Sequence, residues 1–324
     1  MARNPVSESA PTAPTLVRRI HIDTDPGLDD LLALGLALAS PEVKLEGITT
    51  VAGNASIDAV TENACGFLAL ADVEIPVGRG AAAPLALTRV DAEHVHGADG
   101  RKGIALPVQK KRRVATARSV LLHSLRERRV EQVVALGPLT NIAELVSEEP
   151  TLLEDVEIVW MGGTLSGGNV TPLAEFNAYA DPGAAARVLS SGLRVRVIGL
   201  DVTKHVRVRA QDLPRSPFGA SPAARFFEAA LRSLMESEHP LYGEPCAVLH
   251  DPCAVAAVIF PNCLRYESKQ LEVRVEEGRE RGRLMEQTAT RGRCVEYAVE
   301  VQSAEVVRLF LDRLAAWSGK LSSN

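Results

Sequence analysis

The sequence predicts an α/β protein built on a mostly parallel open sheet that helices cover on both faces. Two observations support this fold class. Short β-branched runs alternate with helical segments along most of the chain, and glycine, asparagine or aspartate repeatedly follows the expected end of a strand. Such alternation is typical of βαβ units, whose parallel sheets are buried on both faces. With 324 residues, 46% of them hydrophobic, the chain can bury the core of one large domain.

The expected elements begin with a strand at 16–23 that runs into a Pro-Gly turn. A leucine-rich helix at 29–40 follows, with two acids in its first turn, where the helix dipole favours negative charge. Near the C-terminus, 270–276 and 295–301 alternate like a hairpin, and an amphipathic helix spans 304–317. Between these, we expect strands at 45–51, 130–136, 156–161 and 194–200, and helices at 56–71, 139–146, 182–190, 222–235 and 251–259.

One domain at 16–318 is the simplest organisation, because no repeat or linker divides the chain. We expect 1–15 and 319–324 to be disordered, and 1–15 is rich in Pro, Ser and Ala without the apolar stretch of a signal peptide. Five cysteines without CxxC spacing indicate reduced thiols in a cytoplasmic protein. The net charge of -5, the aromatic content of 4% and the lack of a long apolar run argue against nucleic-acid polymers and membranes as partners.

An acidic cluster stands where the first strand meets the first helix. Helix capping explains Asp29 and Asp30, but Asp23 and Asp25 precede the turn. Two unit charges about 4 Å apart repel by roughly 4 kcal/mol at an effective dielectric near 20, so the cluster needs protons or a cation. The nearby donors are oxygens, which favours Ca²⁺ or Mg²⁺ over zinc. Another ligand is expected from elsewhere in the chain, and Asp251, at the start of a helix, is a candidate whose alternative role is an N-cap.

Five short motifs follow one another along the chain. They are DTDPGLDD at 23–30, which is highly specific, and the individually modest VAGN at 51–54, MGG at 161–163, EFN at 175–177 and HDP at 250–252. Taken together, these motifs resemble the nucleoside hydrolases of the inosine–uridine-preferring type, and the likeness runs from about residue 19 to residue 257. It implies an enzyme that hydrolyses the N-glycosidic bond of ribonucleosides to ribose and free base, a Ca²⁺ cofactor, a homodimer or homotetramer, and a role in purine and pyrimidine salvage.

The resemblance also implies roles for individual residues. Asp25 would be the general base for a water that the metal acidifies, and a carboxylate-rich pocket would stabilise an oxocarbenium-like state. Asp23 would orient its neighbours. The implied Ca²⁺ ligands are Asp25, Asp30, Asp251 and the main-chain carbonyl of Leu136, where family members often have Thr. The implied ribose-binding residues are Asp29, Asn54, Asn169, Glu175 and Asn177, with main-chain help near Met161.

The side of the site that faces the base is less defined. His250 is the expected acid for the leaving base, because histidine titrates near neutral pH. His96 resembles a family histidine in the loop on this side, with an exposed loop histidine as the alternative. Tyr242 is expected either to contact the base or to pack in the core. The segment Arg101-Lys102 stands where the family usually has small or apolar residues, so the preference for purine or pyrimidine bases stays open.

Two other functions fit part of the sequence. A haloacid-dehalogenase-like Mg²⁺ phosphatase would use Asp23 and Asp25, but Gly27 stands where that chemistry usually has Thr or Val, and no clear lysine motif accompanies it. A non-catalytic ribonucleoside-binding protein would use the same pocket. Every acid needed for hydrolysis is present, which argues against the binder.

Overall fold

A nine-stranded sheet forms the centre of the protein, in the order β10-β13-β7-β6-β5-β1-β2-β3-β4. The computed structural model describes residues 17–90, 97–108, 113–213, 218–219, 221–287 and 294–320, apart from the side chains of 240–242. Neighbouring strands of this sheet are parallel, except for the antiparallel edge pair β10–β13. The strands are β1 (Arg18–Thr24), β2 (Val43–Thr50), β3 (Val77–Arg79), β4 (Ala115–Thr116), β5 (Gln132–Ala135), β6 (Glu157–Met161), β7 (Arg194–Ile198), β10 (Leu264–Lys269) and β13 (Val295–Val301).

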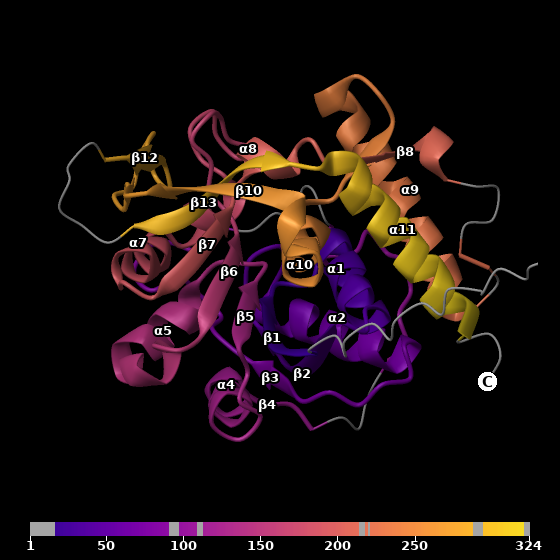
Figure 1. Ribbon diagram of the computed structural model, residues 1–324, viewed down its shortest axis with the longest axis horizontal. Helices are drawn as coiled ribbons and strands as arrows, with labels where there is room; N and C mark the ends of the chain where they lie inside the picture. Colours follow the sequence, from indigo (N-terminus) through magenta and orange to yellow (C-terminus); the bar gives the residue numbers. More distant parts are fainter. Residues whose placement is uncertain are drawn as a thin grey trace, which may run out of the picture.

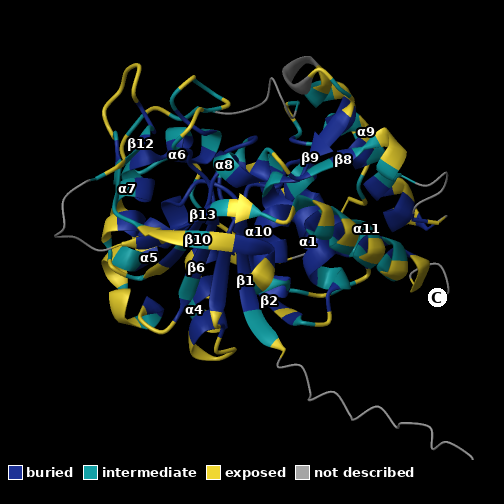
Figure 2. Cartoon of the chain, turned by 45° about the horizontal axis from the view of Figure 1, so that its top comes forward, coloured by how far each residue is buried: buried dark blue, intermediate teal, exposed yellow. Residues whose placement is uncertain are grey.

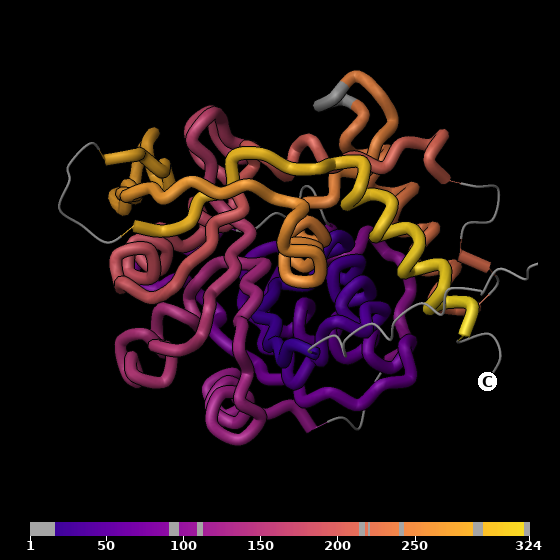
Figure 3. Tube along the Cα trace, in the orientation of Figure 1, coloured from indigo at the N-terminus to yellow at the C-terminus, as the bar shows by residue number. Residues whose placement is uncertain are grey.

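Helices cover both faces of the sheet, which confirms the predicted α/β class (Figure 1). One layer contains α1, α2, α9, α10 and α11, and the opposite layer contains α4, α5 and α7. Figure 3 shows α11 running beside α9. The helices are α1 (Leu28–Ala39), α2 (Ile57–Leu70), α4 (Ala117–Arg126), α5 (Thr140–Glu148), α6 (Phe176–Ala180), α7 (Pro182–Ser190), α8 (Leu200–Thr203), α9 (Pro222–Tyr242), α10 (His250–Ile259) and α11 (Ser303–Lys320).

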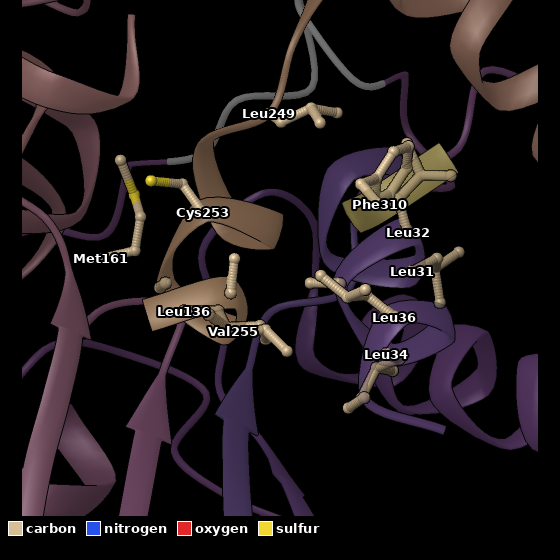
Figure 4. Close-up of a cluster of buried hydrophobic side chains, with 14 of the residues drawn as sticks. Leu31, Leu32, Leu34, Leu36, Leu136, Met161, Leu249, Cys253, Val255 and Phe310 are labelled. Carbon is tan, nitrogen blue, oxygen red and sulfur yellow. The ribbon is translucent and has the colours of Figure 1, made fainter. Parts of the chain in front are cut away.

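The central strands are buried on both faces (Figure 2). In β1, Ile20 and Ile22 belong to the core shared with α1, whereas His21 contacts Ser124 of α4 on the opposite side. Figure 4 shows apolar side chains around α1 and α10, including Leu136 and Met161 at the ends of β5 and β6. Burying each such side chain stabilises the fold by roughly 1.5–3 kcal/mol. The strand ends therefore rest on a rigid apolar base.

The C-terminal hairpin was predicted with the wrong pairing. The strand β13 pairs with β10 and with β7, whereas β11 (Leu271–Val273) pairs with β12 (Leu284–Glu286) in a separate two-stranded sheet. Residue alternation identifies a strand but not its partner, which explains the error.

Helix α9 is longer than the predicted 222–235, and the residues between the two predicted helices 222–235 and 251–259 contain its last turns and β9 (Cys246–Val248). A second antiparallel pair joins β9 to β8 (Arg207–Arg209). The expected disordered segment 1–15 and most of 319–324 lie outside the described residues. Among the described residues, every helix is too short or too polar to cross a bilayer.

Candidate active site and metal centre

The acidic residues meet because two helix N-termini converge at the carboxyl ends of the strands. After β1, a Pro-Gly turn leads directly into α1, which carries Asp29 and Asp30 in its first turn. Helix α10 packs against α1 and carries Asp251 in its own first turn. The positive end of each helix dipole favours these carboxylates. Residues more than 200 positions apart in sequence are thus brought to one place.

Carboxylate oxygens of Asp29, Asp30 and Asp251 all lie within 4.8 Å of one another. Burial raises the pKa of Asp25 and of Asp251 well above the usual range, and the neighbouring aspartates raise both further by repulsion. Burial and repulsion by Asp30 also raise the pKa of Asp29 to about 7. The group therefore needs shared protons or a cation to be stable near neutral pH.

Two oxygens of this group are available to a ligand. Among the described residues, Asp25 Oδ1 and Asp29 Oδ1 are buried atoms that accept no hydrogen bond. An unpaired buried carboxylate oxygen is costly, so each requires a ligand, a proton or water. The donors are all hard oxygens, which fits a Ca²⁺- or Mg²⁺-like ion. The structure brings the predicted ligands Asp30 and Asp251 together with Asp29, which was predicted to bind ribose, whereas the predicted ligand Asp25 is not part of this group of three. The assignment of metal ligands stays a prediction.

Two glycines make room for the Asp25 carboxylate. A Cβ atom on Gly53 would lie 2.0 Å from Asp25 Oδ2, and one on Gly137 would lie 2.6 Å from Oδ1. The remaining support comes from the main-chain N–H of Asn54, which donates to Oδ2 at 2.7 Å. Both glycines follow strand ends. The short distances from their Cβ positions to Asp25 show that the backbone packs closely around this carboxylate. Sequence reasoning identified these glycines as strand-end residues but assigned them no role.

Replacing Gly53 by Ala is expected to lower kcat/KM by about 10²-fold, because the new methyl group displaces the Asp25 carboxylate and a shift near 1 Å at a catalytic group has this effect. Steady-state turnover of a ribonucleoside measures the loss. Gly319→Ala is the matched control, since a Cβ on Gly319 has no neighbour within 4 Å. A Gly53→Ala enzyme with the kcat/KM of the wild type would show that the position of the Asp25 carboxylate does not depend on the absence of a side chain at residue 53.

Asn54 and Thr24 link Asp25 to Asp30. The Asn54 side-chain amide donates to the main-chain oxygen of Asp25 at 3.1 Å and to Asp30 Oδ2 at 3.0 Å. The Thr24 hydroxyl donates to Asp30 Oδ1, and the N–H of Gly27 donates to Oδ2 at 2.9 Å. The amide of Asn54 thus holds the acidic group together, and its contact with ribose stays a prediction.

Asp23, in β1, accepts hydrogen bonds from a separate set of side chains. Asn141 donates to Asp23 Oδ1 at 2.8 Å, and the Thr49 hydroxyl donates to the same atom. Burial raises the pKa of Asp23 to about 7, although these two hydrogen bonds oppose the shift. Behind Thr49, His21 Nε2 lies 2.9 Å from its hydroxyl, and His21 Nδ1 lies 2.9 Å from Ser124 Oγ. Sequence analysis missed Asn141 and Thr49, although Thr49 stands at the end of a predicted strand.

A second group of hydrogen-bonded residues, called here the α6 wall, is organised by Glu175 and Asn177 at the start of α6. The Asn177 amide donates to the main-chain oxygens of Leu136 at 2.7 Å and Met161 at 3.0 Å. Glu175 caps α6 and also accepts from the N–H of Gly163 at 2.7 Å, while burial raises its pKa. The five residues are therefore one connected structure around the ends of β5 and β6.

Asn169 lies on the loop between β6 and α6. Its Oδ1 accepts a hydrogen bond from the N–H of Phe176 at 2.9 Å, which fixes the loop against the start of the helix. This hydrogen bond says nothing about ribose, so the contact of Asn169 with ribose stays a prediction.

His250 is neutral at physiological pH in this structure. Burial lowers its pKa to about 4, and its Nδ1 lies 2.8 Å from the Thr203 hydroxyl. When Thr203 donates this hydrogen bond, Nε2 carries the ring hydrogen and can donate it to a ligand. The expectation of a histidine that titrates near neutral pH therefore does not describe the ligand-free state.

The base-side loop is tied to the acidic turn through Asn63 of α2. The Asn63 amide donates to the main-chain oxygens of Pro26 at 2.9 Å and Asp99 at 2.7 Å, and Arg101 Nε donates to Asn63 Oδ1 at 2.7 Å. Arg101 thus anchors the loop at this point. The other two base-side predictions, His96 and the side chain of Tyr242, lie outside the described residues.

Glu238 is a further acid near the site that sequence analysis missed. Its Oε2 accepts from the N–H of Val248 at 2.7 Å, which ties α9 to β9 just before His250. Burial and the nearby Asp29 raise the pKa of Glu238 to about 8, and Lys102 opposes this shift. Glu238 is one of three glutamates in a long amphipathic helix, so the sequence gave no signal that singled it out.

The fold and this site are those of an α/β protein with a buried acidic cluster that fits a divalent metal ion, and comparison with known proteins identifies the family. The sequence matches the family described as inosine-uridine preferring nucleoside hydrolase over residues 20–308. It is 40% identical to the pyrimidine-specific ribonucleoside hydrolase RihA of an Enterobacter species over 247 residues, which covers 75% of this chain and 79% of the relative. An uncharacterised protein of Schizosaccharomyces pombe is 38% identical over 264 residues, 80% of this chain and 84% of the relative.

Solved structures agree. A plant nucleoside hydrolase superposes with a TM-score of 0.86 at 30% identity, covering 92% of this chain and 99% of the other. A purine-preferring ribonucleoside hydrolase from Gardnerella vaginalis gives 0.83 at 26% identity, covering 93% and 99%. The chain belongs to the inosine–uridine-preferring nucleoside hydrolase family. It is therefore an enzyme of the metal-dependent N-glycosidase class that hydrolyses nucleosides to ribose and free base, as the sequence predicted.

Proposed function

We propose that this enzyme hydrolyses ribonucleosides in a Ca²⁺-dependent reaction with Asp25 as the general base. The observation that carries the proposal is the convergence of three carboxylates from α1 and α10. Two of them, Asp29 and Asp30, also raise the pKa of Asp25, whose buried Oδ1 accepts no hydrogen bond among the described residues. The proposed ligands are Asp25, Asp30, Asp251 and the main-chain oxygen of Leu136. Ca²⁺ is favoured because it accepts several carboxylates at once, whereas Mg²⁺ usually keeps most of its waters.

A bound ion would lower the pKa of a water and orient the ribose hydroxyls. Asp25 would accept a proton from the attacking water at Oδ1, which has no other partner among the described residues, while the N–H of Asn54 holds Oδ2 in place. The buried position raises the pKa of Asp25, which makes it a stronger base than an exposed aspartate once it is ionised. The pocket's negative charge stabilises the positive charge that develops on the sugar.

The ribose is proposed to lie between the acidic turn and the α6 wall. Asp29 Oδ1 is unpaired and can accept a hydroxyl hydrogen. The other proposed ribose contacts are Asn54, Asn169, Glu175, Asn177 and the main chain at Met161. A site that hydrogen-bonds a substrate hydroxyl strongly rejects an analogue that lacks it, so ribonucleosides are expected to be preferred to 2′-deoxyribonucleosides.

His250 is proposed to donate a hydrogen bond or a proton to the leaving base. We expect His250→Ala to slow inosine cleavage by about 10²-fold, in the range of general acid catalysis, and to slow cleavage of p-nitrophenyl riboside far less. The second substrate has a leaving group that departs without protonation. Initial rates on both substrates are the measurement, with Lys204→Ala, at a nearby half-buried position, as the control. Equal losses on the two substrates would remove this role from His250.

Base preference is proposed to be broad, because relatives with pyrimidine-specific and purine-preferring names both resemble this chain. The decisive experiment measures turnover of inosine, adenosine, guanosine, uridine and cytidine, with Ca²⁺ and with EGTA. Release of free base that stops in EGTA and returns with Ca²⁺ supports the proposal. Tight binding without release of reducing sugar would instead indicate a binder, and phosphate release from a nucleotide would indicate the phosphatase.

The proposal also includes the assembly and location expected from the sequence. We propose a homodimer or homotetramer in the cytoplasm that uses small-molecule ribonucleosides, with 16–318 as one domain and His96 and Tyr242 near the base. The thiols of Cys253 and Cys263 are buried and unpaired, in keeping with a reducing compartment. Light scattering after size-exclusion chromatography measures the oligomeric state.

A further inference from the structure

The turn between β11 and β12 contains an arginine with no place in the proposed chemistry. Arg281 is only 2% exposed, which is unusual for this residue type. Its Nε donates to the main-chain oxygen of Tyr179 at 2.9 Å, and its Nη2 donates to those of Ala180 at 3.2 Å and Thr88 at 3.0 Å. Its Nη1 donates to Glu277 at 2.8 Å. The guanidinium thus connects three separate segments of the chain.

The bonds to Tyr179 and Ala180 lie at the C-terminal end of α6. This helix has five residues, too few to be stable alone, and its last carbonyls need partners. A cation at this end also complements the helix dipole. The guanidinium carbon lies 4.7 Å from the ring centroid of Tyr179, which adds a cation–π contact. Arg281 therefore stabilises α6 from the end opposite to the Glu175 cap.

The neighbouring glycine shows how closely the turn packs on this helix. Gly282 has φ +73°, and a Cβ there would lie 2.4 Å from Tyr179 Cα. The contact with Thr88 joins the same turn to the segment after β3. A separate bond joins the segment after β3 to the end of α6, where Asp181 Oδ2 accepts from the N–H of Leu85 at 2.9 Å. The C-terminal hairpin is thus fastened to the wall of the site.

We propose that Arg281 is a positioning residue for the reaction. It holds α6 so that Asn177 keeps its bonds to Leu136 and Met161 and Glu175 keeps its cap. The inference rests on the proposed ribose-binding role of the α6 wall, but the placement of α6 itself can be measured without turnover. Lysine cannot replace this arginine, because an ammonium has neither the planar fork nor the stacking face.

The test compares Arg281→Lys and Arg281→Met with Arg283→Met, which removes a partly exposed arginine of the same hairpin paired with Glu280. In Arg281→Lys we expect amide exchange in residues 176–180 to rise by about tenfold, as in local opening, while exchange in 28–39 is unchanged. KM for the ribonucleoside should rise by about tenfold, and the Ca²⁺-induced shift of the unfolding midpoint should persist, since the acidic group lies on other elements.

Arg283→Met should match the wild type in all three readouts. If Arg281→Met does not fold, Arg281→Lys decides alone, because it retains the buried charge. Unchanged exchange in 176–180 and unchanged KM in Arg281→Lys would overturn the inference, whatever its melting temperature. An enzyme that turns over no nucleoside would overturn the proposed function instead, and the exchange measurement would still test whether Arg281 positions α6.

Discussion

Replacing Asp25 by Asn is expected to lower kcat by about 10²–10⁴-fold, the range for loss of a general base. Asparagine has the same shape, so it fits the space left by Gly53 and Gly137 and can still accept the hydrogen bond from the Asn54 N–H. It cannot accept a proton from water. Ribonucleoside affinity, measured by calorimetry with Ca²⁺ present, should change far less than kcat.

The control for this variant is Asp58→Asn, which changes an exposed aspartate paired with Arg79 on the surface. This substitution should leave kcat within about twofold of the wild type, since surface changes away from the site have little effect. An Asp25→Asn enzyme with nearly full kcat would show that another group accepts the proton. If Asp25→Asn lost Ca²⁺ binding together with kcat, the main contribution of Asp25 would be to hold the metal.

Removing the metal should produce the second large effect. Ca²⁺ at about 100 times its dissociation constant should stabilise the folded protein by roughly 2.7 kcal/mol, because only the folded chain brings the three carboxylates together. Differential scanning calorimetry with Ca²⁺ and with EGTA measures this as a rise of the unfolding midpoint by a few degrees. The affinity for Ca²⁺ should increase with pH, because burial and mutual repulsion raise the pKa of the proposed ligands Asp25 and Asp251 well above the usual range, and protons compete for the same oxygens.

Asp251→Asn separates this explanation from a general loss of stability. It removes one of the mutually repelling buried carboxylates, so the metal-free variant should unfold at a midpoint no lower than that of the wild type. Its response to Ca²⁺ should be lost. A variant that keeps the full Ca²⁺ shift would exclude Asp251 as a ligand, and Asp58→Asn again serves as the unaffected reference.

Local patterns made most of the fold predictable. The alternation of strands and helices identified the parallel sheet, and α7 was predicted with its observed bounds at 182–190. Short elements escaped because three or four residues give no periodic signal, as for β3 and β8. The pairing of β13 escaped for another reason: its choice of β10 and β7 depends on the whole sheet and not on its own residues.

The site shows the same division. The four acids between the end of β1 and the start of α1 are visible because they are close in sequence. Asp251 gave only a weak signal, and the family resemblance is what connected it to them. The partners of Asp23 could not be assigned from the sequence. Thr49 comes from β2, where strand register places it opposite Asp23, and Asn141 comes from helix α5, whose position the sequence does not show. Amides such as that of Asn177 look like ligand donors in the sequence, whereas the fold directs them to main-chain oxygens.

The chain of contacts from Ser124 through His21 and Thr49 to Asp23 has a consequence for hydrogen positions. A threonine hydroxyl has a single hydrogen, and Thr49 donates it to Asp23. His21 must then place its own ring hydrogen on Nε2 to donate to Thr49, and Ser124 must donate to the bare Nδ1. Asp23 thereby sets the tautomer of His21, which contacts α4 on the far side of the sheet. The nitrogen resonances of the His21 imidazole can therefore be used to determine the direction of every hydrogen bond in this chain of contacts.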